Sequence, residues 1–229
     1  MTAGEFAADE RIAAVWFDLY GTLVVIEPLA AACESVAPGH GAALAGRWRQ
    51  RQLEASWLRT LMGVWEPFDV VTRAALRVAA AELRVDRPLD DLDGAFERLP
   101  ARAGAAAVLA GLHASGVLVG VLSNGSESMI EKTLLGAGLY GAIDVVRSVD
   151  AVRRYKPDPS VYALAMPPSG VPPGRIGFVT ANGWDAAGAA TFGLRVVWLR
   201  ADVAAQLPAV GAPNVTVAAW EEIQEALGV

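Results

Sequence analysis

Two residue types that often carry catalysis are scarce in this sequence. Its 229 residues include one cysteine, Cys33, and two histidines, His40 and His113. One cysteine cannot form an internal disulfide or a cysteine-rich zinc site. The sequence also lacks a Gly-x-Ser-x-Gly motif. Nucleophilic catalysis by a serine or cysteine with a histidine partner therefore has no support.

Positive charge is sparse as well. Nineteen lysines and arginines stand against 25 aspartates and glutamates, which gives a net charge of −6 and a pI near 5.0. The densest basic stretch, RWRQR at 47–51, is interrupted by Trp48 and Gln50. This balance argues against nucleic acids and anionic membranes as partners.

Long apolar runs are missing too. Glycine and proline break the longest uncharged stretches, so the sequence predicts no membrane-spanning helix. The first twelve residues are polar and acidic, which predicts no signal peptide and a cytoplasmic protein. With 54% hydrophobic and 19% charged residues, the chain is expected to fold around one large core and a smaller second unit.

Short apolar runs that alternate with helical patterns predict an α/β fold with a Rossmann-like parallel sheet. The expected strands are Ala13–Phe17, Val117–Leu122, Ile143–Val146, Ile176–Thr180, Arg195–Leu199 and a short Val215–Val217. The expected helices of this core are Ala105–Ala114, Ser126–Gly136, Pro159–Ala165, Asp185–Thr191 and Trp220–Leu227.

Residues 26–99 interrupt this alternation, because they show helical periodicity and no convincing strand. Residues 44–63 and 67–85 each predict an amphipathic helix, and Gly63 ends the first. The apolar positions of that first helix are Leu44, Trp48, Trp57, Leu58, Leu61 and Met62. The pattern predicts a helical cap domain, residues 26–99, inserted into a core made of residues 1–25 and 100–229.

Polar side chains follow four of the expected strands, and ligands of open parallel sheets bind at such strand ends. In chain order they are Asp18 and Thr22, Ser123 and Asn124, Lys156 and Tyr162, and Thr180, Asn182 and Asp185. Each motif alone is typical of a turn or a helix start. Four of them at successive strand ends indicate one converging site.

These residue types suit chemistry on an anionic substrate. Asp18 can act as a nucleophile, kept ionised by Lys156 and by backbone N–H groups after the strand. Ser123 and Asn124 supply neutral donors for a carboxylate or a phosphate. Asp185 can orient Lys156 or position a water. A non-catalytic binding protein, the alternative of another class, would not need this constellation.

The order of these motifs resembles that of the haloacid dehalogenase superfamily along nearly the whole chain. Asp18 with Thr22, Ser123, Lys156 and Asp185 match its general motifs. Longer stretches are similar to the L-2-haloacid dehalogenases (type II). They are FDLYGTL (17–23), WRQRQLEASWLRTLM (48–62), LSNGS (122–126), YKPDPSVY (155–162) and NGWDAAGAATFG (182–193).

Position 20 separates two branches of this superfamily. Its phosphatases carry a second aspartate two residues after the nucleophile, and paired acids that hold Mg²⁺ in the fourth motif. Here Tyr20 occupies the first position, and the fourth motif offers Asn182 and the single Asp185. A halide needs no proton to leave, and a substrate without phosphate needs no magnesium. The resemblance thus implies displacement at carbon without metal or cofactor, and a phosphatase is the weaker alternative.

The resemblance implies hydrolytic dehalogenation of short (S)-2-haloalkanoic acids to (R)-2-hydroxy acids. Asp18 is expected to displace the halide from C2 and form an ester with inversion. Water positioned by Asn182, Asp185 and Lys156 then hydrolyses that ester. The expected partner is thus a small 2-substituted carboxylic acid. Relatives are commonly homodimers, and the tryptophans of the long cap helix suit such an interface.

The resemblance also implies substrate contacts. Arg49, on the first long cap helix, is expected to face the halide together with Asn124, although arginines on such helices also commonly form a solvated face. Ser123 and the backbone amides near Leu19 and Tyr20 are expected to hold the substrate carboxylate. The remaining matched positions are Leu53, Phe68, Tyr162 and Thr180, which stands where a serine is usual.

Three positions are candidate specificity residues: Asp69, Ala55 and Trp184. Asp69 follows Phe68 where the family usually has an aromatic residue, and Ala55 replaces a tyrosine. If Asp69 lines the site, its carboxylate suits an ammonium-bearing substrate such as L-azetidine-2-carboxylate, from whose C2 an amine leaves. If Asp69 faces solvent, halide remains the expected leaving group.

Overall fold

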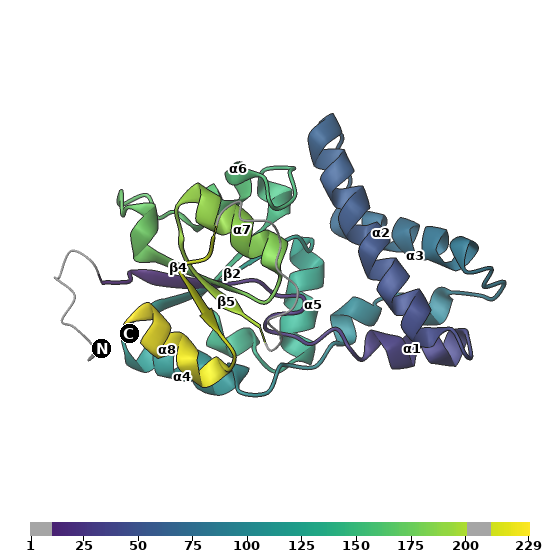
Figure 1. The fold of residues 1–229 in the computed structure, drawn as a ribbon, viewed down its shortest axis with the longest axis horizontal. Coiled ribbons are helices and arrows are strands. Elements are labelled where there is room, and N and C mark those ends of the chain that lie inside the picture. Colours follow the sequence, from purple (N-terminus) through teal and green to yellow (C-terminus); the bar gives the residue numbers. More distant parts are fainter. Residues whose placement is uncertain (1–10, 201–211) are drawn as a thin grey trace.

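The computed structural model describes residues 11–200 and 212–229. Within them, six strands form one parallel sheet in the order β3-β2-β1-β4-β5-β6 (Figure 1). The strands are β1 (Ala14–Phe17), β2 (Leu118–Ser123), β3 (Val145–Ser148), β4 (Ile176–Thr180), β5 (Arg195–Leu199) and β6 (Val215–Val217). The predicted α/β fold is confirmed. The strand order reverses at β1 and β4, where ligands of such sheets bind.

The edges of some predicted strands are wrong by one or two residues. Ala13 lies just before β1. Val117 lies between α4 and β2 instead of opening the strand, because its N–H bonds back to the Leu112 carbonyl of the helix at 3.1 Å. The third strand begins at Val145 and not at Ile143, because Ile143 closes a 3₁₀ helix over residues 140–142.

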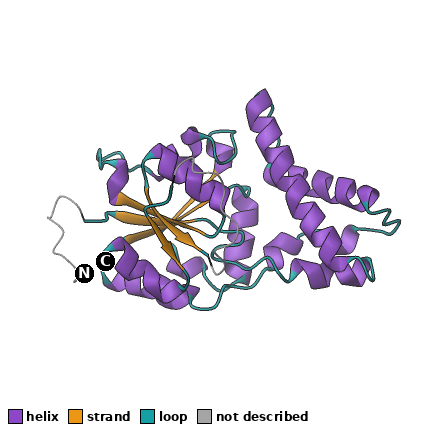
Figure 2. Ribbon diagram, viewed as in Figure 1, coloured by secondary structure: helices purple, strands orange, loops and turns teal. Residues whose placement is uncertain are grey.

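Helices cover both faces of the sheet (Figure 2). On one face, α4 (Ala105–Ala114) packs against α8 (Ile223–Leu227), while α6 (Pro159–Tyr162) and α7 (Gly183–Phe192) lie together on the other (Figure 1). Helix α5 (Glu127–Gly136) packs against β3. Two predicted helices are partly 3₁₀: residues 163–165 extend α6 in that form, and residues 220–222 precede α8 in that form.

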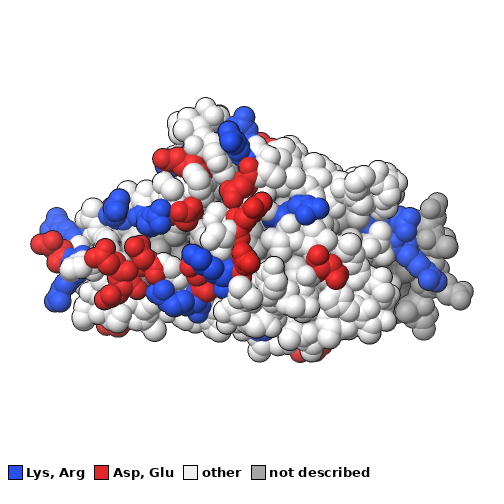
Figure 3. Space-filling view, turned by 180° about the vertical axis from the view of Figure 1, so that it is seen from behind, with Lys and Arg blue, Asp and Glu red and all other residues white. Residues whose placement is uncertain are grey.

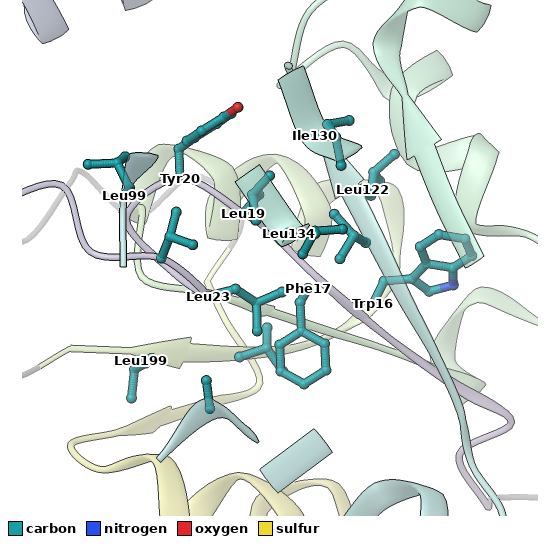
Figure 4. Close-up of a cluster of buried hydrophobic side chains, with 14 of the residues drawn as sticks. Trp16, Phe17, Leu19, Tyr20, Leu23, Leu99, Leu122, Ile130, Leu134 and Leu199 are labelled. Atoms are coloured by element: carbon teal, nitrogen blue, oxygen red, sulfur yellow. The ribbon is translucent and has the colours of Figure 1, made fainter. Parts of the chain in front are cut away.

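Strand β1 lies in the middle of the sheet, and all four of its residues are buried. Its side chains belong to the apolar cluster drawn in Figure 4, with Leu122 of β2 and Ile130 of α5. Trp16 pairs in register with Gly120 of β2. A Cβ added at Gly120 would lie 2.4 Å from the Trp16 ring, so this ring position requires a glycine on the neighbouring strand.

Residues 26–99, all of them described, contain helices and no strand. Helices α1 (Leu29–Val36), α2 (Gly41–Met62) and α3 (Phe68–Glu82) pack on one another beside the sheet (Figure 1). We call this segment the cap. Its helices occupy the span predicted from the sequence, and the division into two domains stays a prediction.

The C-terminal end of α2 projects past its neighbours (Figure 1). Leu58, Leu61 and Met62, predicted as apolar positions of the packed helix, are 54%, 83% and 64% exposed. The prediction is wrong at these positions, because no element of the described chain covers this face of the helix end. A homodimer stays a prediction.

Aromatic contacts join the cap to the core. Trp57 of α2 meets Trp184 of α7 edge to face, with ring centroids 5.6 Å apart. Trp65, between α2 and α3, stacks on Tyr155 at 4.9 Å. The Tyr155 N–H also donates to Thr60 Oγ1 at 2.9 Å. These contacts hold α2 over the carboxyl ends of the strands.

The face opposite that of Figure 1 carries acidic and basic side chains interspersed over the cap half, whereas the core half is mostly uncharged (Figure 3). No extended basic patch is visible on the described part of this face. No helix within residues 11–200 and 212–229 combines the length and apolar content that a membrane span requires.

A pair of glycine substitutions tests this packing. We expect Gly120→Ala to lower the free energy of unfolding by about 2 kcal/mol or more, because the new methyl group collides with the buried Trp16 ring. Gly46→Ala, in α2 with nothing within 4 Å of its added Cβ, should raise stability by about 0.5–1 kcal/mol. Denaturant unfolding measures both, and equal stabilities would contradict the assigned β1–β2 register.

Candidate active site

Asp18 directly follows β1, in the middle of the sheet, and is 5% exposed. Its carboxylate accepts three hydrogen bonds from three separate segments. Oδ1 accepts from Lys156 Nζ at 3.0 Å, and Oδ2 accepts from Thr22 Oγ1 at 2.9 Å and from Asn182 Nδ2 at 2.7 Å. These donors offset the cost of removing the carboxylate from water, and they explain how an acid can be buried at this strand end.

The turn after Asp18 brings Thr22 back to it. Gly21 has φ +89°, a backbone conformation that residues with a Cβ rarely adopt. The turn closes with hydrogen bonds from the Thr22 N–H to the Leu19 carbonyl and from the Gly21 N–H to the Val24 carbonyl. Thr22 Oγ1 also accepts from the Ala181 N–H at 2.9 Å and so ties this loop to the end of β4.

Lys156 lies between two carboxylates. Its Nζ is 3.0 Å from Asp18 Oδ1 and 2.8 Å from Asp185 Oδ2, and the side chain is fully buried. The ammonium also lies 4.8 Å from the centroid of the Phe178 ring. Burial by itself lowers the pKa of Lys156, but the two carboxylates outweigh it and raise that pKa above its usual value. The lysine is therefore a permanent cation.

Asp185, in the first turn of α7, is the second buried carboxylate. Besides Lys156 it accepts a hydrogen bond from the Tyr162 hydroxyl to Oδ1 at 2.8 Å. Burial raises the pKa of Asp185 to about 6, with Lys156 opposing the shift and the charge of Asp18 adding to it. Burial also raises the pKa of Tyr162, so Tyr162 remains a neutral donor.

Three other predicted residues support the loops of the site. Ser123 Oγ accepts from the Gly125 N–H at 3.1 Å, and Thr180 Oγ1 accepts from the Asn182 N–H at 3.1 Å. Asn124 Oδ1 accepts from the Lys156 N–H at 2.9 Å, which fixes the backbone on which the lysine stands. The Asn124 amide donates to no acceptor in the described chain.

Tyr20 directs its hydroxyl toward helix α5. That hydroxyl is 3.0 Å from Thr133 Oγ1 of α5, and its ring contacts Phe68 and Phe96. The backbone N–H groups of Leu19 and Tyr20 bond to no acceptor among the described residues. Two such N–H groups beside a strand end are typical of an anion-binding loop.

The cap adds one cation. Arg49 of α2 is partly buried and donates from Nη1 to Gln52 Oε1 at 2.6 Å. Burial lowers the pKa of Arg49, and the charges of Asp18 and Asp185 oppose that shift. The arginine is therefore close enough to the two carboxylates to interact with them. Leu53, one turn along α2, is half-buried, and Phe68 is fully buried at the start of α3.

The three candidate specificity residues lie in different places. Asp69 pairs with Arg73 at 3.0 Å on α3, with its side chain 36% exposed, and it makes no contact with the polar cluster around Asp18. Ala55 is partly buried, and its carbonyl accepts from Arg59. Trp184 lines a cavity of about 560 Å³ that reaches Asn182 and Gly21. Of the three, only Trp184 borders the site.

Some residues of the site escaped the sequence reasoning. Gln52 accepts a hydrogen bond from Arg49 and donates one to Thr72, and Phe178 lies against Lys156. The spacing of three residues between Arg49 and Gln52 on a predicted helix is a signal that places both on one face.

The described residues contain no group of three or more histidine, cysteine or acidic side chains that could hold a metal ion. Two carboxylates do converge here, and the Lys156 ammonium lies between them. The point where the two acids meet is thus occupied by the ammonium group of Lys156, a cation that belongs to the protein itself.

Comparison with known proteins bears on this site. The family model of the haloacid dehalogenase-like hydrolases matches residues 12–193. An (S)-2-haloacid dehalogenase from Pseudomonas putida is 40% identical over 195 residues, 83% of this chain and 85% of that protein. Haloacetate dehalogenase H-2 from Moraxella is 35% identical over 193 residues, 83% of this chain and 86% of its own.

Solved structures agree. The L-2-haloacid dehalogenase from Xanthobacter autotrophicus with chloropropionic acid covalently bound superposes with a TM-score of 0.88. It is 34% identical in sequence, and the match covers 93% of this chain and 97% of that one. The chain therefore belongs to the haloacid dehalogenase-like hydrolases, in the branch of the L-2-haloacid dehalogenases.

Proposed function

We propose that this hydrolase releases halide from short (S)-2-haloalkanoic acids and forms (R)-2-hydroxy acids, with Asp18 as the nucleophile. The observation that carries the proposal is the buried Asp18 carboxylate, which accepts hydrogen bonds from Lys156, Thr22 and Asn182. The names of the relatives, and the covalently bound chloropropionic acid in one of them, support it.

The hydrogen bonds distinguish the two oxygens of Asp18. Oδ2 accepts two hydrogen bonds, which engage both of its lone pairs, whereas Oδ1 accepts one from Lys156. Oδ1 thus has a free lone pair and attacks C2 of the substrate opposite the halide. The C2–halide bond breaks as the C2–Oδ1 bond forms, and the configuration at C2 inverts.

The second step uses the other oxygen. In the ester, Oδ2 of Asp18 becomes the carbonyl oxygen, and water attacks the Asp18 carboxyl carbon. Thr22 Oγ1 and Asn182 Nδ2 already point at Oδ2, so they stabilise the negative charge that develops there. Asp185 accepts the proton of the water. The bond between the Asp18 carboxyl carbon and Oδ1 then breaks, and Oδ1 leaves on C2 as the product hydroxyl with the second proton of the water. Asp18 is again a carboxylate and now contains the water oxygen. No bond to C2 changes in this step, so the configuration set in the first step is kept.

Charges and donors around Asp18 define the substrate site. The N–H groups of Leu19 and Tyr20, with the Ser123 hydroxyl, bind the substrate carboxylate. Arg49 and the amide of Asn124 face the leaving halide. Leu53, Phe68, Thr180 and Trp184 complete the walls of this site. A small 2-haloacid satisfies each of these groups and needs neither a metal nor a cofactor.

The amine-leaving alternative depends on a carboxylate at Asp69 in the site, and the Asp69 carboxylate instead pairs with Arg73. A phosphatase needs an acid at position 20, and the Tyr20 hydroxyl is directed to Thr133. Neither alternative gains an observation in its favour, so we retain halide as the leaving group.

The first prediction concerns the covalent step. With EDTA present, wild-type protein should release chloride from L-2-chloropropionate, and Asp18→Asn should lower this rate by about 10⁴-fold or more. In a single turnover in ¹⁸O-water, the product hydroxyl should carry ordinary oxygen from Asp18, and the heavy isotope should enter Asp18. Product labelled in that first turnover would mean that water attacks C2 directly.

A second prediction separates the two steps. Thr22→Val removes one donor to Oδ2 and should slow ester hydrolysis by about 100-fold, with less effect on ester formation. Mass spectrometry of the protein during turnover should then detect the accumulated ester on Asp18. Thr22→Ser should restore hydrolysis. Absence of the ester together with slow initial halide release would contradict the role given to Thr22.

A third prediction concerns pH. The pKa of Asp185 is raised to about 6, so Asp185 is ionised above that pH and protonated below it. When Asp185 is protonated, Asp18 is the only anionic partner of Lys156. The ammonium then binds the Asp18 carboxylate more strongly and makes it a weaker nucleophile. We therefore expect kcat/KM to be flat above about pH 6 and to fall about tenfold per unit below it.

Tyr162→Phe supplies the matched test of this assignment. The Tyr162 hydrogen bond lowers the pKa of Asp185, so its loss should move the midpoint of the acid limb to higher pH. Tyr140→Phe, at an exposed tyrosine, should leave the limb in place. A wild-type midpoint near 4, or no shift in Tyr162→Phe, would contradict the assignment to Asp185.

A further inference from the structure

We propose that Gln52, held by Thr72, is a positioning residue that directs the Arg49 guanidinium at the leaving halide and leaves its positive charge unpaired. The proposal rests on the proposed function, because Arg49 acts on the halide only if the protein releases one. It adds two residues of the cap that have no role in the steps described above.

The three residues form one hydrogen-bonded chain across α2 and α3. Arg49 Nη1 donates to Gln52 Oε1 at 2.6 Å, and Gln52 Nε2 donates to Thr72 Oγ1 at 2.7 Å. Thr72 Oγ1 in turn donates to the Phe68 carbonyl at 2.6 Å. Gln52 is fully buried and Thr72 is 6% exposed. The Trp48 indole N–H also donates to the Thr72 carbonyl, which fixes α3 against α2.

This series of hydrogen bonds allows only one orientation of the Gln52 amide. A threonine hydroxyl has a single proton, and Thr72 donates it to the Phe68 carbonyl. Thr72 Oγ1 can then only accept from Gln52, so the amide NH₂ must face Thr72. The amide oxygen consequently faces Arg49, and no rotation of the amide satisfies all three groups as well. Thr72 thus determines that Gln52 presents an acceptor to the guanidinium.

The neutral partner sets Arg49 apart from its neighbours. The three other arginines of α2 pair with carboxylates: Arg47 and Arg51 with Glu82, and Arg59 with Glu66. Arg49 alone on this helix bonds to an amide, which orients a guanidinium without cancelling its charge. A carboxylate at position 52 would form an ion pair with Arg49 inside the cap and weaken its field at the halide.

Gln52→Glu is the direct test, because it keeps the shape of the side chain and changes its charge. Arg49 stabilises the negative charge that develops on the halide in the transition state. In Gln52→Glu, kcat for L-2-chloropropionate should therefore fall by about 100-fold, with a smaller change in KM. The inhibition constant of chloride as a product should rise by about tenfold, because the paired guanidinium binds halide more weakly.

Two further variants give the test its controls. Gln50→Glu makes the same change two residues away, at an exposed side chain that bonds to Glu54, and should leave kcat and chloride inhibition within about twofold of wild type. Thr72→Val removes the hydroxyl that orients Gln52 and should lower kcat by about tenfold, and Thr72→Ser should restore it. If Gln52→Glu does not fold, the comparison of Thr72→Val with Thr72→Ser tests the proposal.

Thermal unfolding of each variant separates positioning from packing. Variants of Gln52 and Thr72 that melt at lower temperature but keep wild-type kcat and chloride inhibition would overturn the inference and leave the proposed function intact. Wild-type protein that shows no Asp18-dependent halide release would instead overturn the proposed function, and the inference with it.

Discussion

The site depends on one buried cation. Lys156 is fully buried and contacts two carboxylates, Asp18 and Asp185, that reach it from different strands. Without the ammonium, two desolvated carboxylates would face each other, and at least one would take up a proton. Each member of this group would be costly to bury alone. Their mutual contacts raise the pKa of Lys156, and burial leaves Asp185 with a pKa of about 6.

The parallel sheet makes this group possible. Asp18 follows β1 and Asp185 follows β4, and the two strands are hydrogen-bonded neighbours, so their carboxyl ends deliver both acids to one place. Thr22 links the same two ends, since it donates to Asp18 and accepts from the Ala181 N–H. Lys156 arrives on the loop after β3, where Asn124 from the end of β2 holds its backbone. Four loops therefore meet at this charged group.

Much of this could be predicted from the sequence, because apolar runs, turn residues and motif order are local signals. The six strands and the polar residues at their ends belong to that class. Features set by tertiary packing were not predictable. Leu61 reads as an apolar position of a packed helix but is exposed, because α2 extends past its neighbours. The side chain of Asp69 could face the site or solvent, and the i,i+4 pair with Arg73 decides between them. The orientation of the Gln52 amide is likewise not a local signal, because Thr72, twenty residues away, fixes it.

The proposed reaction moves one negative charge through a site that is balanced at the start. Asp18 and Asp185 carry two negative charges, and Lys156 and Arg49 carry two positive ones. Ester formation removes the charge of Asp18 and places it on the halide, so it passes from the lysine of the core to the arginine of the cap. The charge of Asp18 helps to raise the pKa of Asp185, and its loss in the ester lowers that pKa. Asp185 is then ionised to a greater extent at the moment when a base is required. Formation of the ester thus prepares the base that hydrolyses it, because it removes the like charge that opposed the ionisation of Asp185.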